Sequence, residues 1–129
     1  MHWLVDGMNV IGSRPNRWWN DPDRAVRDFI DELAGFAEAN GEETTVVFDR
    51  RPPDLRPGRH DGVEVAFASR RGRNAADHEI VEMVETDEES ASLTVVTSDA
   101  ALAERVRDLG AEVMGAGTFR RRLDRSDRS

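Results

Sequence analysis

The chain has 129 residues and a net charge of −8, and all of its 18 basic residues are arginines. The length fits one domain that folds around its own core. The lack of cysteine excludes thiol catalysis, disulfides and zinc–thiolate sites, and the lack of lysine excludes Schiff-base chemistry, P-loop sites and lysine-dependent phosphoacceptor domains. No apolar run reaches about 18 residues, so we expect a soluble cytoplasmic protein without a membrane partner.

The hydrophobic pattern predicts strands that alternate with helices. The longest helix has apolar residues at positions i, i+4, i+7 and i+11, which form one face of an α-helix. The runs TVVF and LTVV are apolar throughout, as in strands that are buried on both faces. In chain order we expect a strand at 2–6, a helix at 21–41, a strand at 44–49, a loop without regular structure at 50–62, a strand at 63–68, a loop at 69–74, a helix at 75–89, a strand at 93–99, a helix at 100–110, a strand at 111–115 and a last helix from 118.

This alternation predicts a doubly wound α/β fold, with a mainly parallel five-stranded sheet and helices on both faces. The domain is expected to span residues 1–123, and a flexible tail follows at 124–129. In such a sheet, ligands bind at the carboxyl ends of the strands, beside the point where the strand order switches.

Three of the predicted strands end in a carboxylate, at Asp6, Asp49 and Asp99. Parallel strands bring these ends to one edge, where two charges about 4 Å apart would repel by about 4 kcal/mol. A fourth acid, Asp77, lies on the apolar stripe of its helix and is expected to point toward the sheet. Carboxylate oxygens are preferred ligands of Mg²⁺ and Mn²⁺, so the pattern indicates a metal site.

Each acid alone also has a structural explanation. Asp99 or Ser98 can cap the helix that follows, and Asp77 can interact with its helix dipole. Asp6 and Asp49 can be turn residues. The coincidence of all four at one edge favours the metal site.

Other polar and aromatic side chains lie close to these acids in the sequence. Asn9 can orient Asp6 or a water, or form an Asx turn, and Ser98 can orient a water or a carboxylate. Loop arginines can bind phosphate, and exposed tryptophans can stack on unpaired bases, although loop arginines also balance acids and Trp18 or Trp19 can belong to the core. The residues expected to contact a nucleic acid are Arg50, Arg70, Arg71, Arg73 and Trp18, and His78 is expected to act beside the metal ligands without binding the metal.

The segments LVDGMNVIG, VVFD, NAADHEIVEMV and VVTSD resemble, in order and spacing, the YacP-like group of NYN domains within the PIN-like nuclease superfamily. This resemblance covers about residues 3–123. It implies a Mg²⁺- or Mn²⁺-dependent ribonuclease with an acidic metal centre. Two positions depart from the family pattern: Met8 stands where tyrosine is common, and His78 stands where a second acid often follows Asp77, although Glu79 is next to it.

The acids predict phosphodiester hydrolysis, and the resemblance implies that the substrate, and the ligand of the arginines and Trp18, is RNA. Stacking tryptophans favour single strands, whose bases are exposed. Asp6, Asn9, Asp77 and Asp99 are the expected catalytic residues, and Asp6, Asp49, Asp77 and Asp99 are the expected metal ligands. One alternative is a non-catalytic module that binds RNA or the ribosome and has a degenerate metal site. A phosphatase with Asp6 as its nucleophile is disfavoured, because that chemistry needs a second aspartate at position 8, which is Met8.

Overall fold

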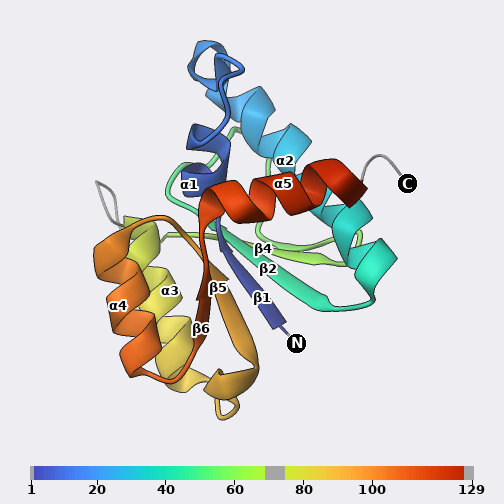
Figure 1. Ribbon diagram of the computed structural model, residues 1–129. Helices are drawn as coiled ribbons and strands as arrows, with labels where there is room; N and C mark the ends of the chain where they lie inside the picture. The colour runs from blue at the N-terminus through green and yellow to red at the C-terminus, as the bar shows by residue number, and fades with distance from the viewer. Residues whose placement is uncertain (1, 69–74, 127–129) are drawn as a thin grey trace.

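A single six-stranded sheet forms the centre of the molecule, with the strand order β3-β4-β2-β1-β5-β6 (Figure 1). The computed structural model describes residues 2–68 and 75–126. Neighbouring strands are parallel except for β3 and β4. The predicted α/β class is confirmed. The strands are β1 (His2–Asp6), β2 (Glu43–Phe48), β3 (Gly58–His60), β4 (Val63–Phe67), β5 (Leu93–Val96) and β6 (Glu112–Met114).

The sheet has six strands and not the five that were predicted, because part of the expected loop at 50–62 forms β3. A two-residue turn at Asp61 and Gly62 joins β3 to β4, and both residues have positive φ, at 48° and 90°. Asp-Gly is a preferred pair for this kind of hairpin turn. The turn folds β3 back antiparallel to β4, with His60 opposite Val63.

The described residues form five α-helices and two short 3₁₀ helices, and all except α5, which follows the last strand, lie between strands. The first, α1, was not predicted, and it starts directly after Asp6. Its first residue must be glycine, because a Cβ at Gly7 would lie 3.0 Å from Val46 Cγ2 and closer still to the Phe48 ring. The helices are α1 (Gly7–Gly12), η1 (Trp18–Asn20), α2 (Pro22–Asn40), α3 (Ala75–Thr86), η2 (Ser90–Ser92), α4 (Ala100–Asp108) and α5 (Ala116–Ser126).

α3 and α5 differ most in extent from the prediction. α3 ends at Thr86 and not at residue 89, because the Asp87 side chain accepts a hydrogen bond from the Glu89 N–H and so favours a turn. α5 extends to Ser126, three residues beyond the boundary expected at 123. Within α5, Phe119 and Leu123 lie one turn apart and are buried in the core, which stabilises the helix. Residues 127–129 lie outside the described part of the chain.

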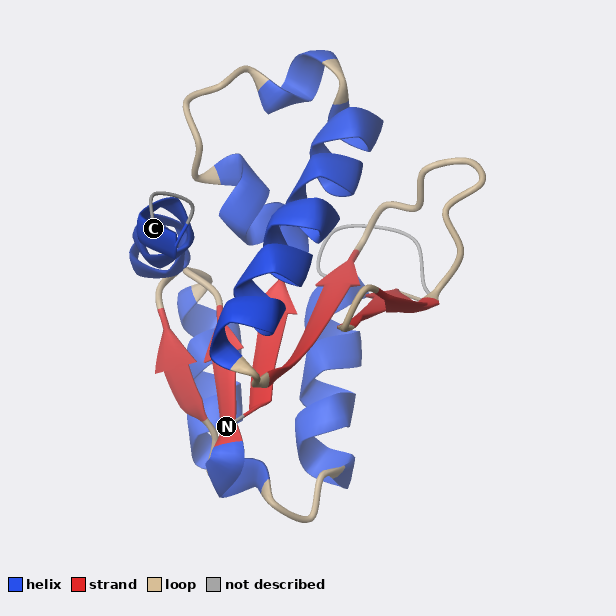
Figure 2. Cartoon of the chain, turned by 90° about the vertical axis from the view of Figure 1, so that its right-hand side faces the viewer, coloured by secondary structure: helices blue, strands red, loops and turns tan. Residues whose placement is uncertain are grey.

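The helices cover both faces of the sheet (Figure 2). α1, α2 and α5 pack on one face, over a core that contains Trp3 and Val5, and α3 and α4 pack on the other, over a core that contains Leu4. Because side chains alternate along a strand, Asp6 lies on the same face as Leu4. The topology therefore places the acid at the end of β1 beside α3 and α4.

Candidate active site at the carboxyl end of the sheet

Asp6 is the buried acid of this region, and only 5% of its surface is exposed. It ends β1, which lies between β2 and β5, at the point where the strand order switches. The Thr97 hydroxyl donates a 3.0 Å hydrogen bond to Asp6 Oδ2. Burial raises the Asp6 pKa to about 7, and the neighbouring negative charges of other aspartates add to this rise, whereas the Thr97 bond opposes it.

Asp77, in the first turn of α3, is partly exposed and lies on the same side of the sheet. Its pKa is raised to about 6, first by burial and then by the charge of Asp99 and a hydrogen bond with that carboxylate. Asp49 contributes to the rise, while Arg105 opposes it. This hydrogen bond means that the Asp77 and Asp99 carboxyl groups are in contact. A hydrogen bond between two carboxyl groups also needs a proton on one of them.

Asp99 and Asp49 lie just beyond their strands and not within them. β5 ends at Val96, and Asp99 is the N-cap of α4, where its Oδ1 accepts hydrogen bonds from the N–H groups of Ala101 and Leu102 at 3.0 and 3.2 Å. Asp99 thus caps α4, which is the structural role that the sequence also allowed. Both capping hydrogen bonds use Oδ1 and neither uses Oδ2. Asp49 follows the end of β2 and is exposed, and its charge acts on both Asp6 and Asp77.

Asn9 and Ser98 connect three segments around these acids. Asn9 Oδ1 accepts a 2.8 Å hydrogen bond from the Ser98 N–H, and Ser98 Oγ accepts a 2.9 Å bond from the N–H of Ala116. The Asn9 side chain therefore holds the loop before Asp99, instead of forming a local turn. The Ser98 side chain joins the same loop to the start of α5.

Sequence reasoning missed Thr97, which is 2% exposed. Its hydroxyl donates to Asp6 and also accepts a 3.1 Å hydrogen bond from the Asp99 N–H. One buried side chain thus positions two of the candidate acids. The signal was present in VVTSD, where a hydroxyl continues an apolar strand that is buried on both faces.

The donor atoms of this region fit a hard divalent cation. Four aspartates carry carboxylate oxygens, and the charges of Asp49 and Asp99 help to raise the pKa of Asp6 and of Asp77. Within residues 2–68 and 75–126, however, no three Asp, Glu or His side chains form a ready coordination cluster. Mg²⁺ commonly keeps several waters and uses one or two protein carboxylates, so the contacting pair Asp77 and Asp99 is a sufficient starting point.

The structure describes two of the five residues predicted to bind RNA, Arg50 and Trp18. Arg50 forms a 2.7 Å ion pair with Asp23. Trp18 is partly buried and packs against the core, whereas the neighbouring Trp19 is 58% exposed. His78 is exposed and lines a cavity of about 480 Å³ between α3 and α4. Arg70, Arg71 and Arg73 lie outside the described residues.

Comparison with known proteins places this arrangement in a family. The model of the YacP-like NYN domain matches residues 3–129. The chain belongs to the YacP-like NYN domain family. This family is nuclease-like, and membership of the NYN family indicates an association with RNA.

Solved structures of Rae1 (YacP) from Bacillus subtilis share the fold of this NYN domain. The W164L mutant is 25% identical, with a TM-score of 0.79 over 98% of this chain and 77% of that chain. A second Rae1 (YacP) structure is 24% identical, with a TM-score of 0.81 over 99% of this chain and 76% of that one. No curated protein matches the sequence. In the described part of the chain, no helix is long and apolar enough to cross a membrane.

Proposed function

We propose that this NYN domain is a Mg²⁺- or Mn²⁺-dependent ribonuclease that cuts single-stranded RNA. The observation that carries the proposal is the electrostatic coupling of Asp6, Asp49, Asp77 and Asp99 at one end of the sheet. Membership of a nuclease-like family supports it. RNA in the cytoplasm, including RNA bound to the ribosome, is the expected substrate.

The candidate acids have distinct roles in this proposal. A bound cation would lower the pKa of a water and stabilise the charge that develops on the phosphate. Asp77 and Asp99 would hold the cation, and Asp49, which is the most exposed of the four acids, would add its negative charge to the site. Thr97 fixes Asp6 through Oδ2, so Asp6 Oδ1 is the atom that orients the attacking water. Asn9 keeps the Ser98 loop, and with it Asp99, in place.

A labelled single-stranded RNA tests the proposal directly. We expect cleavage with Mn²⁺ and none with EDTA, and we expect Asp6→Asn to lower the rate by more than about 100-fold, because outer contacts to metal sites alone are worth 10- to 100-fold. Asp108→Asn is the matched control, since Asp108 is an exposed acid at the far end of α4. Its rate should match that of the wild type.

The second candidate function is an RNA-binding module without catalysis. It is favoured by the lack of a ready three-ligand cluster in the described residues, and by His78 at a position where the family often has an acid. In that case the wild type would bind the RNA with the same affinity in Mn²⁺ and in EDTA and would not cut it. Cleavage that is equal in the wild type and Asp6→Asn would contradict the assignment of Asp6.

A further inference from the structure

α5 begins at the candidate active site and leads away from it. Its first residue, Ala116, donates a hydrogen bond to Ser98 Oγ, one residue before Asp99. Figure 1 shows α5 starting beside α1, at the carboxyl ends of β1 and β5, and running across the molecule toward the C-terminus. A strand of RNA that is cut at the acids can therefore continue along this helix.

Two of the four arginines on α5 serve the fold. Arg120 donates a 2.6 Å hydrogen bond to the Ser13 carbonyl, which ties α5 to the loop after α1. The Arg122 guanidinium lies 5.2 Å from the centre of the Trp3 ring, over the core. Both side chains are thus held by intramolecular contacts.

The other two, Arg121 and Arg125, are exposed and share one face, since they are four residues apart. Arg121 turns back toward the start of α5: its Nη2 donates to Thr118 Oγ1 at 3.2 Å, and its Nη1 lies 3.7 Å from the place of a Cβ on Gly117. Arg125 has no hydrogen-bond or ion-pair partner within residues 2–68 and 75–126. The helix rise separates the two by about 6 Å along the axis.

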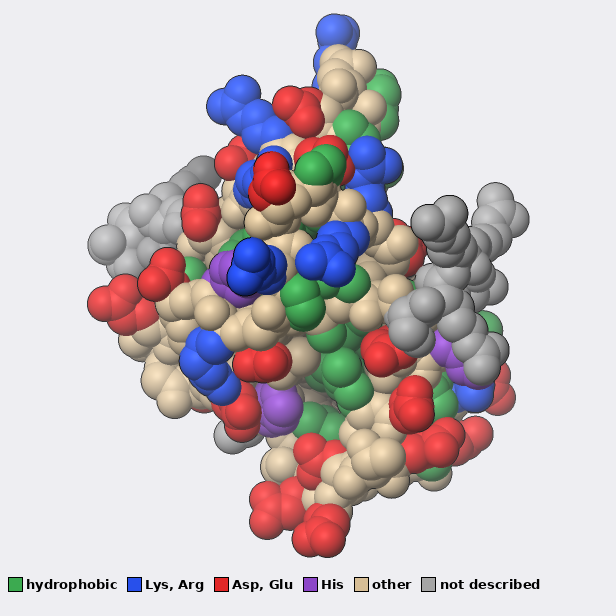
Figure 3. Space-filling view, turned by 180° about the vertical axis from the view of Figure 1, so that it is seen from behind, with side chains coloured by type: hydrophobic (Ala, Val, Ile, Leu, Met, Phe, Trp, Pro, Cys, Tyr) green, Lys and Arg blue, Asp and Glu red, His purple; other side chains and the backbone are tan. Residues whose placement is uncertain are grey.

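The charge around α5 favours a phosphate chain. α5 has four arginines and one acid, and that acid, Asp124, lies 3.6 Å from the Arg14 guanidinium. Residues 75–89, on the opposite face of the sheet, contain seven acids and no arginine. Figure 3, which shows the molecule from behind, on the side away from α5, has acidic side chains gathered over its lower part. RNA would be repelled from α3 and attracted toward α5.

We propose that Arg121 and Arg125 bind backbone phosphates of the RNA segment that leaves the active site along α5. This inference rests on the proposed function, because it takes RNA as the ligand. Guanidinium groups grip phosphate through paired hydrogen bonds without reading the base. The contact therefore adds affinity for any sequence, and it needs RNA long enough to reach from the acids to the third turn of α5, where Arg125 lies.

The test is binding of a fluorescent single-stranded RNA to Arg121→Gln/Arg125→Gln in EDTA, at several salt concentrations. Each phosphate contact contributes about 0.7 to the slope of log affinity against log salt for a single strand, so losing two contacts lowers the slope by about 1.4. At 0.15 M salt this equals a loss of affinity of about tenfold. Arg121→Lys/Arg125→Lys keeps both charges and should recover most of the slope.

The matched control is Arg59→Gln/Arg107→Gln. It removes the same charge at the amino end of the sheet, where Arg59 pairs with Glu64 and Arg107 lies in the last turn of α4. The inference is overturned if the α5 variant keeps the wild-type slope, or if the control loses as much. If the wild type neither binds nor cuts RNA, the proposed function itself fails, so the two failures are distinguishable.

Discussion

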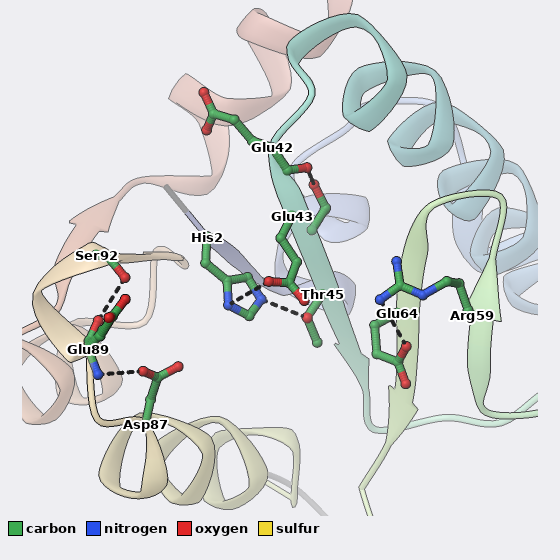
Figure 4. A network of polar contacts seen from close by, with 10 residues as sticks. His2, Glu42, Glu43, Thr45, Arg59, Glu64, Asp87, Glu89 and Ser92 are labelled. Carbon is green, nitrogen blue, oxygen red and sulfur yellow. Dashed lines mark hydrogen bonds and ion pairs between the residues drawn. The ribbon is translucent and has the colours of Figure 1, made fainter.

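At the amino end of the sheet, acidic side chains lie beside cations and donors, whereas at the carboxyl end they lie beside one another. Glu43 is 4.0 Å from His2, and Glu64 is 3.8 Å from Arg59 (Figure 4). At the other end, the charges of neighbouring aspartates raise the pKa of Asp6 and of Asp77. Ion pairs explain the first arrangement as part of the fold. The second costs free energy of folding, so we attribute it to function.

Replacing Asp6 with Asn should break this contrast most strongly. The folded-state pKa of about 7 lies above the ordinary value of 3.8. Below pH 3.8 the carboxyl is protonated in both states. Between pH 3.8 and pH 7 the carboxyl ionises only in the unfolded chain, so the free energy of unfolding falls as the pH rises. Above pH 7 this decrease is complete and amounts to about 4 kcal/mol. In urea unfolding with EDTA, Asp6→Asn should lack this loss.

Two controls accompany the Asp6 measurement. Asp108→Asn should follow the wild-type profile within about 0.5 kcal/mol at each pH, because that acid is exposed. Added Mg²⁺ should stabilise both the wild type and Asp6→Asn at pH 8, since both keep Asp77 and Asp99, the proposed ligands of the cation. A wild type as stable at pH 8 as at pH 4 in EDTA would show that the carboxylate is not desolvated.

Thr97→Val should separate positioning from folding at the carboxyl end. Valine keeps the shape but loses the donor to Asp6 and the acceptor for the Asp99 N–H. We expect Mn²⁺-dependent cleavage to fall about 10- to 100-fold, which is the usual range for partners of metal ligands. The pH at which Asp6 ionises should also rise, because the hydroxyl bond lowers that pKa. If Thr97→Ser restores both the cleavage rate and the Asp6 pKa, Thr97 acts by positioning the acids. If Thr97→Val lowers the stability but leaves the cleavage rate unchanged, Thr97 serves the fold only.

The same substitution at the amino end, Thr45→Val, should have a different outcome. Thr45 is buried, and its Oγ1 lies 2.9 Å from His2 Nε2. Loss of one such hydrogen bond lowers the free energy of unfolding by about 1 kcal/mol. Cleavage should stay within about twofold of the wild type, as measured in the Thr97→Val assay. A large loss of activity would mean that the two ends are coupled through the sheet.

The sequence predicts those features that depend on periodicity and on parallel strands. The apolar stripe of the helix at 75–89 placed Asp77 toward the sheet, and the ends of β1 and β5 placed Asp6 and Asp99 near each other. Parallel strands share one carboxyl edge, but Asp99 lies three residues beyond the end of β5, where Thr97 and the N-terminus of α4 position it. Whether these acids bind a metal stays a prediction.

Features that depend on register and tertiary packing could not be derived in the same way. α1 has six residues, which are too few for a helical period to emerge. β3 has only three residues, the first of which is Gly58, and only the Asp61–Gly62 turn marks it. The division between a packed Trp18 and an exposed Trp19 is set by contacts with the core across the chain.

Glu64→Gln should have the smallest effect and sets the baseline for the comparison. Glu64 and Arg59 face each other across β3 and β4, and their side chains are 44% and 58% exposed. Solvent screens such a pair, so its loss should change the free energy of unfolding by less than about 0.5 kcal/mol, with no change in cleavage. Urea unfolding in low and high salt provides the measurement. If Glu64→Gln lowers the free energy of unfolding as much as Thr45→Val does, ion pairs at the amino end contribute substantially to the stability of the fold. The two ends would then differ more than surface charges alone predict, with stabilising pairs at the amino end and repelling acids at the carboxyl end.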